Sequence, residues 1–378
     1  MMETLELLFV LFAIWIFVYV IFRRLSKKRD DLEVNPLYIM FRTTKLNNFL
    51  KKTAQSKPRS WRIFSNIGII VGCIEIVLAI YFLTLNLYRF LYVPQEATAM
   101  VPLLPGITVS LGWFPYILIA IAPAVTIHEL SHGIIAFLEK IPIKSSGIIV
   151  APITFGGFVE PDDKVFEKAS LVSKLRVISV GSLSNIIVGL LAMLLTFTLF
   201  MPTSGVLIMN VQPEGPAFNA GIRPWDVIVK VNGNYTSNVS EFIFFMLNVE
   251  PETLLVIETS NGIRNVVTRS SVENASRGII GVRGLTDYYT MRVGEINTQL
   301  SYQVHMILNW VFIIMVNLAI FNMIPLFPLD GENFIYAILK VKMTKRIKET
   351  RIIINAIFLT LIVSNFLFSF NTYGITPI

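Results

Sequence analysis

Residues 127–133 read Ile127-His128-Glu129-Leu130-Ser131-His132-Gly133 and lie within a long apolar run. On a helix, side chains four residues apart lie on one face about 6 Å apart, so His128 and His132 can bind one zinc ion through their imidazoles. Glu129 lies beside them, where its carboxylate reaches a water molecule at the metal. Because the chain has only three histidines, we predict a metal site here rather than two core histidines bonded to backbone carbonyls.

The composition of the whole chain indicates a membrane protein. Of its 378 residues 54% are hydrophobic and only 15% are charged, and the mean hydropathy is +0.66. Soluble proteins have more charge and less apolar sequence. The net charge of +7 fits membrane topology and lipid headgroups. We therefore expect the lipid bilayer as a partner, and no nucleic acid.

Six apolar runs have the length of transmembrane helices, namely residues 7–22, 63–87, 113–138, 177–200, 304–327 and 352–370. Lys and Arg gather on alternate connecting segments, which places those segments in the cytoplasm and both termini outside. The histidine pair then lies in the cytoplasmic half of the bilayer. Glu75 lies near the middle of the second run, where an unpaired carboxylate is unfavourable. We expect it to face other helices or a water-filled cavity, and its role stays open.

Residues 141–161 are too short and too rich in glycine and proline to span the membrane as a helix. Two β-prone pieces, residues 147–153 and 155–160, predict a re-entrant β-hairpin that dips back toward the metal. Such backbone is tolerated at membrane depth only where protein shields it or where it lines a wet cavity. An ordinary cytoplasmic loop is the alternative.

Residues 204–285 have the composition of a soluble domain, with valine-rich strands between turns. The stretch 211–233 is similar to PDZ domains in the arrangement found in bacterial-type proteases, which predicts a small α/β PDZ-like extracytoplasmic domain. In that fold residues 206–211 would pair with a ligand strand and residues 201–205 would cover a free carboxylate. A domain that only rigidifies the outer face is the alternative. Three sequons, at Asn234, Asn238 and Asn274, fit glycosylation or chance.

The chain thus divides into four predicted parts. They are two N-terminal helices with a basic loop and an outer loop, the first half of a catalytic membrane core, the PDZ-like domain, and the second half of the core with a C-terminal helix: residues 1–112, 113–203, 204–285 and 286–378. The fold class is an α-helical polytopic membrane protein with about six transmembrane helices, a re-entrant hairpin and a small PDZ-like domain.

A catalytic zinc ion usually takes three protein ligands, and the HExxH pattern supplies two. His305 lies 25 residues before Asp330, roughly 37 Å along a helix, so it is excluded as the third. Asp330 enters from the same predicted side as His128, and the prolines before it loosen the helix. Position alone leaves open whether Asp330 is a ligand or a carboxylate in the polar interface at a helix end.

Together the motifs resemble the site-2 protease family of intramembrane zinc metalloproteases. They are HExxH, the GxxxN pattern of residues 181–185, the PDZ-like insert and the NxxPxxxLDG pattern of residues 322–331. The resemblance implies one catalytic Zn²⁺ ion held by His128, His132 and Asp330, with Glu129 and Asn185 as catalytic residues. It also implies a substrate path bordered by Gly156, Gly157, Phe158, Asn322 and Pro325. The sequence departs from the family at Ser182, where a proline is usual, and at Ser184.

These residues predict a zinc metalloendopeptidase that hydrolyses peptide bonds within or near transmembrane segments, in regulated intramembrane proteolysis. Glu129 would act as the general base, and Asn185, a neutral donor, would stabilise the oxyanion. Expected partners are transmembrane protein substrates, with a peptide or substrate ectodomain at the PDZ-like domain. The expected location is the cell membrane, with the active site toward the cytoplasm. The alternatives are an inactive scaffold or chaperone, and a metal transporter, which would need metal-binding groups spread across the membrane.

Overall fold

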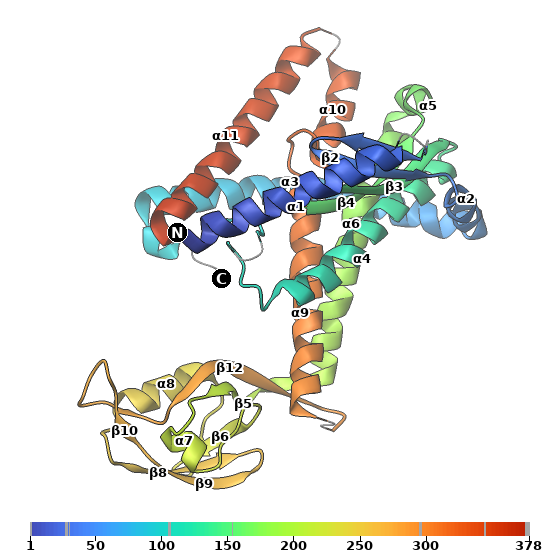
Figure 1. Cartoon of the computed structure of the whole chain (residues 1–378). Coiled ribbons are helices and arrows are strands. Elements are labelled where there is room, and N and C mark those ends of the chain that lie inside the picture. The colour runs from blue at the N-terminus through green and yellow to red at the C-terminus, as the bar shows by residue number, and fades with distance from the viewer. Residues whose placement is uncertain are drawn as a thin grey trace. The chain divides into compact units, whose positions relative to one another are not determined.

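The computed structural model describes residues 2–26, 29, 31–104, 107–152, 154–294, 297–343 and 345–374. The chain forms two compact units, coloured along the sequence in Figure 1. The first unit combines Met1–Leu190 with Trp310–Ile378, and the second is Leu191–Asn309. Each unit has its own buried hydrophobic clusters.

Among the described residues, five helices are long and apolar enough to cross a membrane: α3 (Pro58–Tyr92), α4 (Phe114–Leu138), α6 (Leu171–Leu199), α9 (Thr298–Asn322) and α11 (Ile347–Tyr373). Each one coincides with a predicted span, so the protein is a polytopic membrane protein. The helix α1 (Met2–Ser26) contains the first predicted span, residues 7–22, but is not among these five. The span at residues 7–22, the total of six spans and the placement of the termini therefore stay predictions.

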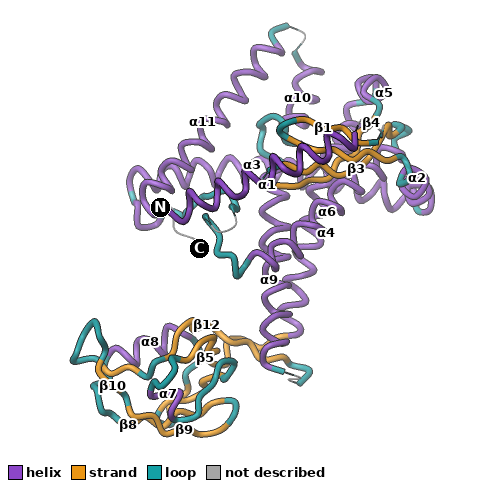
Figure 2. Tube along the Cα trace, viewed as in Figure 1, coloured by secondary structure: helices purple, strands orange, loops and turns teal. Residues whose placement is uncertain are grey.

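Four antiparallel strands form one sheet in the order β1-β2-β3-β4, drawn in orange beside the helices in Figure 2. The strands are β1 (Leu32–Asn35), β2 (Tyr38–Thr43), β3 (Ile143–Ala151) and β4 (Thr154–Pro161). Strands β3 and β4 pair over most of their length, with Gly147 opposite Phe158. The predicted hairpin is therefore confirmed as a hairpin, although Ile153 lies outside the described residues.

The strands β1 and β2 were not predicted, because the connection between the first two helices was expected to be a basic loop. Their apolar side chains alternate along the strands, so that Leu32 and Ile39 pack beneath Trp15 of α1. The indole Nε1 of Trp15 donates a hydrogen bond of 2.8 Å to the carbonyl oxygen of Pro36 in the turn. Period-two alternation around a turn containing proline is the signal that could have identified this hairpin.

The remaining helices of the first unit are short. They are α2 (Asn47–Ser56), the 3₁₀ turn Pro94–Glu96, α5 (Asp163–Lys168) and α10 (Asp330–Lys342). Leu50 of α2 is fully buried and lies against Gly133 of α4. On another face of α4, Ala120 and Ala124 pack with Met315 of α9. Small residues at both contacts allow the neighbouring elements to approach α4 closely.

The second unit is a PDZ-like α/β domain. Its main sheet has the order β12-β5-β6-β8-β9, and β7 pairs with β6. The unit contains β5 (Phe200–Val211), α7 (Pro216–Asn219), β6 (Val227–Val231), β7 (Asn234–Tyr235), α8 (Val239–Leu247), β8 (Leu254–Thr259), β9 (Gly262–Val267), β10 (Arg269–Ser270), β11 (Gly278–Ile279) and β12 (Val282–Met291). Alternate residues of β5, including Val206 and Ile208, are fully buried in its core.

The structure corrects the strand that was predicted to pair with a ligand. Residues 206–211 belong to β5, which pairs with β12 on one side and with β6 on the other. Where β5 is paired on both sides, at Val206 and Leu207, it has no free backbone groups for a further strand. Among the described residues, β12 ends the sheet on that side, and the N–H of Val239 at the start of α8 donates to Oδ1 of Asp287 in β12 at 2.8 Å.

Candidate metal centre

Helix α4 brings the two histidines of the HExxH motif together. The Nε2 atoms of His128 and His132 lie 3.0 Å apart, and the two ring centroids are separated by 4.6 Å. His128 is buried, with 5% of its surface exposed. The spacing of four residues on one helix face therefore places the rings as the sequence predicts.

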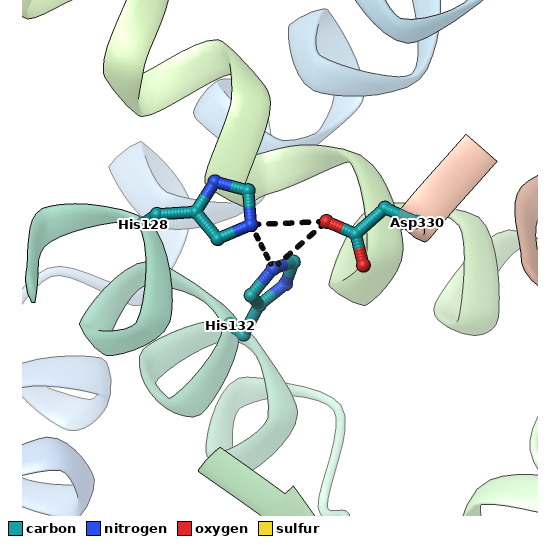
Figure 3. A group of neighbouring side chains, drawn as sticks. All are labelled: His128, His132 and Asp330. Atoms are coloured by element: carbon teal, nitrogen blue, oxygen red, sulfur yellow. Dashed lines mark hydrogen bonds and ion pairs between the residues drawn. The ribbon is translucent and has the colours of Figure 1, made fainter. Parts of the chain in front are cut away.

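Asp330 reaches the same point from the first turn of α10 (Figure 3). Its Oδ2 atom lies 3.0 Å from Nε2 of His128 and 3.2 Å from Nε2 of His132. Two ligands of a tetrahedral zinc ion are separated by roughly 3.3 Å when each bond is about 2.0 Å. The three atoms therefore have nearly the spacing of one face of such a site, and these residues could hold a metal ion.

The chain turns sharply before Asp330, and Gly331 makes the turn compact. A Cβ atom at Gly331 would lie 2.1 Å from the carbonyl oxygen of Met323, which is closer than any side chain tolerates. Helix α9 ends at Asn322 and α10 begins at Asp330, so the predicted span 304–327 is too long at its end. The prolines do not loosen a continuous helix as predicted; the helix stops, and a second one starts at the carboxylate.

The ring orientation of His132 is fixed by helix α6. Its Nδ1 atom lies 2.6 Å from the carbonyl oxygen of Val177, which can only accept a hydrogen bond. The Nδ1–H tautomer that this contact requires leaves the lone pair of Nε2 free for a metal. Among the described residues, Nδ1 of His128 has no hydrogen-bond partner.

Gly181 of α6 forms the third side of the site. A Cβ atom there would lie 2.5 Å from Nε2 of His132 and 2.7 Å from Cε1 of His128. Only a residue without a side chain fits so close to both rings. The glycine of the GxxxN pattern therefore lets α6 approach the histidines and not merely another helix.

Glu129 lies on α4 next to the ligand group, and strand β4 covers it. The backbone N–H of Val159 donates a hydrogen bond of 3.0 Å to Oε2 of Glu129. A Cβ atom at Gly157 would lie 3.0 Å from Cγ of Glu129 and 3.0 Å from Cγ1 of Val125. Glycine at position 157 thus keeps the space beside the glutamate narrow but free of side chain.

Asn185 lies one helical turn beyond Gly181 on α6. Its side chain is fully buried, and neither Oδ1 nor Nδ2 has a hydrogen-bond partner among the described residues. The preceding residue, Ser184, joins α6 to α4 because its Oγ donates to Oγ of Ser131 at 2.6 Å. A buried amide without a partner is uncommon in proteins, so this side chain is available to a ligand.

The predicted substrate-path residues lie in different places. Gly157 touches Glu129, whereas the ring of Phe158 faces the other side of the sheet, where the guanidinium of Arg42 lies 5.7 Å from its centroid. Gly156 approaches only Ile149. Asn322 is near the metal ligands, with Nδ2 at 3.5 Å from Nε2 of His128.

The last predicted substrate-path residue is Pro325, and His305 is the histidine that was excluded as a ligand. Pro325 is buried in the turn between α9 and α10. His305 belongs to the second unit, where its ring stacks on Tyr289 with the two centroids 4.0 Å apart.

Fold and site together define a membrane-embedded protein with a histidine-rich candidate metal centre and a PDZ-like domain inserted between its helices. The model of peptidase family M50 matches residues 116–364, which include all the residues of the centre. The chain belongs to peptidase family M50, the site-2 protease family.

Two relatives of known sequence are similar to this chain. The chain is 29% identical over 333 residues to an uncharacterized protein of Methanocaldococcus jannaschii, a match that covers 86% of this chain and 83% of the relative. It is 26% identical over 209 residues to a membrane-bound transcription factor site-2 protease homolog of Arabidopsis thaliana, covering 53% of this chain and 40% of that protein.

One solved structure that resembles part of the chain is the PDZ domain of an SdrC-like protein from Listeria monocytogenes. The match covers 22% of this chain and 88% of that domain, at 20% identity and a TM-score of 0.20.

Proposed function

We propose that the protein is an intramembrane zinc metalloprotease of the site-2 type, which hydrolyses peptide bonds within or near transmembrane segments of other membrane proteins. The observation that carries the proposal is the convergence of His128, His132 and Asp330 on one point beside Glu129. Two imidazole nitrogens and a carboxylate oxygen are the donors of a catalytic zinc site that keeps its fourth position open.

The ligand group and Glu129 have separate tasks in this proposal. When bound, a zinc ion acidifies a water molecule and polarises the carbonyl of the peptide bond. Glu129 accepts the proton of the attacking water and passes it to the leaving amine. The hydrogen bond from Val159 holds one oxygen of this carboxylate, which leaves the other oxygen for the proton.

Asn185 suits the developing oxyanion. A neutral amide donor stabilises negative charge without bringing a second charge into the membrane. The support for this role is its complete burial and its unpaired Nδ2 atom. Replacement of a donor of this kind lowers kcat by roughly 10²–10³-fold.

The sheet supplies a place for the substrate backbone. A transmembrane helix hides its carbonyls in its own hydrogen bonds, so it must unwind before it is cut. Strand β4 ends the sheet beside α4, and an extended segment added to that edge would lie next to Glu129. Gly156, Gly157 and Phe158 are the proposed contacts on β4, and Asn322 and Pro325 those on the turn side.

We further propose the sidedness predicted from the charges, with the metal centre toward the cytoplasm and the PDZ-like domain, residues 204–285, outside. The unpaired edge of β12, rather than β5, is the proposed place for a peptide or a substrate ectodomain, because β12 alone ends the sheet on that side. Regulated intramembrane proteolysis is the process that fits such an enzyme.

The test is cleavage of a panel of single-span membrane proteins by the purified protein in liposomes, with bound zinc measured in parallel. We expect cleavage that a chelator abolishes, a loss of roughly 10²–10⁴-fold in Glu129→Gln with zinc retained, and loss of zinc in Asp330→Asn. Glu139→Gln, at the end of the same helix and paired with Arg176, should behave as the wild type. Normal zinc content in all variants without cleavage of any substrate would favour a scaffold instead.

A further inference from the structure

Glu75 is a buried acidic residue that the proposed mechanism does not use. It lies in helix α3 with 2% of its surface exposed, and neither carboxyl oxygen has a hydrogen-bond partner among the described residues. A carboxyl group in a membrane helix is retained at considerable energetic expense. A buried carboxyl group needs a hydrogen-bond partner, and no described side chain supplies one to Glu75 directly.

The neighbours of Glu75 on α3 contact the turn that leads to Asp330. A Cβ atom at Gly72 would lie 3.0 Å from Cε of Met323. One turn further along α3, Ala79 packs in the same cluster as Ile324. Glu75 lies between these two positions in the buried stripe of α3. Glu75 therefore lies on the side of α3 that packs against the Met323–Ile324 region.

The residue that follows Asp330, Gly331, packs directly on the backbone of Met323 and Ile324. Within the described part of the chain, no hydrogen bond joins the carboxyl group of Glu75 to that of Asp330. Polar groups that lie too far apart for a direct hydrogen bond are commonly joined by a water molecule.

The two oxygens of Asp330 differ in their contacts. Oδ2 lies within 3.2 Å of both histidine Nε2 atoms, whereas Oδ1 has no hydrogen bond among the described residues. Carboxylates that bind metals are normally held by a hydrogen bond in the surrounding layer, which fixes the oxygen that faces the metal. Nothing else within the described part of the chain supplies that hydrogen bond to Oδ1.

We propose that Glu75 is a positioning residue of the metal centre, which holds Oδ1 of Asp330 through an ordered water and so keeps Oδ2 turned toward His128 and His132. The inference rests on the proposed metal function of the site. It gives the carboxyl group the hydrogen-bonding partner that its burial demands, and it explains why an acidic side chain lies in an otherwise apolar membrane helix.

The test compares Glu75→Leu with Glu75→Gln in the full-length protein. Leucine has a similar size but cannot hold a water, so we expect zinc affinity to fall by roughly 10–100-fold, as for other residues that support metal ligands. Glutamine keeps a donor and an acceptor, and it should restore the affinity to within a few-fold of the wild type. Affinity is measured by competition with a chromophoric chelator, which does not depend on catalytic activity.

If Glu75 only stabilised the fold, the zinc-free Glu75→Leu protein would melt below the wild type. We expect the contrary. Replacing an unpaired buried carboxyl by leucine removes a desolvation penalty, so the zinc-free Glu75→Leu protein should melt no lower than the wild type. Asn86→Leu is the matched control on the same helix: it removes a buried polar contact to Asn365 and should lower stability but not zinc affinity.

Two results would overturn the inference, namely Glu75→Leu that binds zinc as tightly as the wild type, or Glu75→Gln that binds it as weakly as Glu75→Leu. The results differ if the proposed function itself is wrong. In that case the wild type itself binds no zinc, or His132→Ala binds as much zinc as the wild type does.

Discussion

The backbone N–H of Val159 donates a hydrogen bond of 3.0 Å to Oε2 of Glu129, which ties strand β4 to the acidic residue of the HExxH motif. The donor belongs to the edge of the sheet that faces α4. The strand proposed to receive a substrate and the proposed general base are therefore in direct contact. A change in the position of β4 changes the position of the carboxylate.

Gly157→Ala tests this coupling. The added methyl group would meet Cγ of Glu129 and Cγ1 of Val125, each at 3.0 Å, and would push the carboxylate away from its place. We expect a loss of proteolytic activity of roughly tenfold or more, since misplacement of a catalytic group by 1 Å lowers rates by about 10²-fold. Gly112→Ala is the control, because its methyl group lies at an exposed position and would meet only Oγ of Ser110 at 3.8 Å, an ordinary contact. Equal losses in both variants would contradict the coupling.

Gly181→Ala should weaken metal binding. The methyl group would lie within 2.7 Å of atoms of both histidines, so the rings must turn away from their common point. We expect zinc affinity to fall by roughly 10–100-fold, by analogy with other changes that misorient ligands, and metal analysis after dialysis at graded free zinc measures it.

Gly189→Ala lies on the same helix and serves as the control. Its methyl group would meet Val316 at 2.9 Å and Met315 at 3.2 Å, which are packing contacts with α9. It should lower thermal stability without changing zinc affinity. A loss of zinc in this variant equal to that in Gly181→Ala would show that any disturbance of α6 suffices.

Asn86 and Asn365 join helices α3 and α11 inside the first unit. Nδ2 of Asn86 donates to Oδ1 of Asn365 at 3.0 Å, and both side chains are buried. Buried amide pairs between membrane helices contribute about 0.6 kcal/mol and at most about 1.7 kcal/mol. A double-mutant cycle of Asn86→Leu and Asn365→Leu, read by unfolding in mixed micelles, should give a coupling in that range. Simple additivity of the two changes would show that the contact contributes nothing.

Glu33 contributes stability that depends on pH. The guanidinium of Arg42 and then the hydroxyl of Tyr38, both hydrogen-bonded to its carboxylate, hold the pKa of Glu33 below its usual value. A lowered folded-state pKa stabilises the protein above the unfolded pKa of about 4.3, and this contribution is lost as the pH falls through the folded pKa. The side chain is 45% exposed, so we expect less than about 1 kcal/mol.

The measurement is the melting temperature of Glu33→Gln against the wild type at pH 7 and below pH 4. The variant should melt lower at pH 7, and the gap should close in acid, where the wild-type carboxylate is also neutral. Glu273→Gln, at an exposed position, should show no gap at either pH. A gap that widens in acid would have the wrong sign.

Local spacing along the sequence predicts the histidine pair, but it does not predict how Asp330 reaches that pair. Two histidines four residues apart meet because a helix repeats every 3.6 residues, which needs no tertiary information. Asp330 is 202 residues from His128, and position alone left its role open. Only the resemblance of the combined motifs favoured it, and the turn closed by Gly331 is the physical reason that it reaches the histidines.

The pattern of apolar residues gave incomplete or wrong elements where distant segments of backbone lie in close contact. The predicted span 304–327 ignored the end of α9 at Asn322, because hydropathy does not register the contact of Gly331 with Met323. The pairing of β2 with β3 was missed for a similar reason, since it joins residues about a hundred positions apart, such as Arg42 and Ser145. Sheet order likewise decided which strand of the PDZ-like domain has a free edge.

The hydrogen bond from Trp15 to the turn at Pro36 holds helix α1 against strands β1 and β2, and we expect α1 to protect these strands from pairing with other molecules. Strand β1 ends the sheet opposite β4, and an uncovered edge strand pairs readily with another copy of itself. A version of the protein that lacks residues 2–26 would leave Leu32 and Ile39 without their cover. Such a truncated chain should associate through β1 into dimers and larger aggregates, while the histidine pair on α4 stays intact.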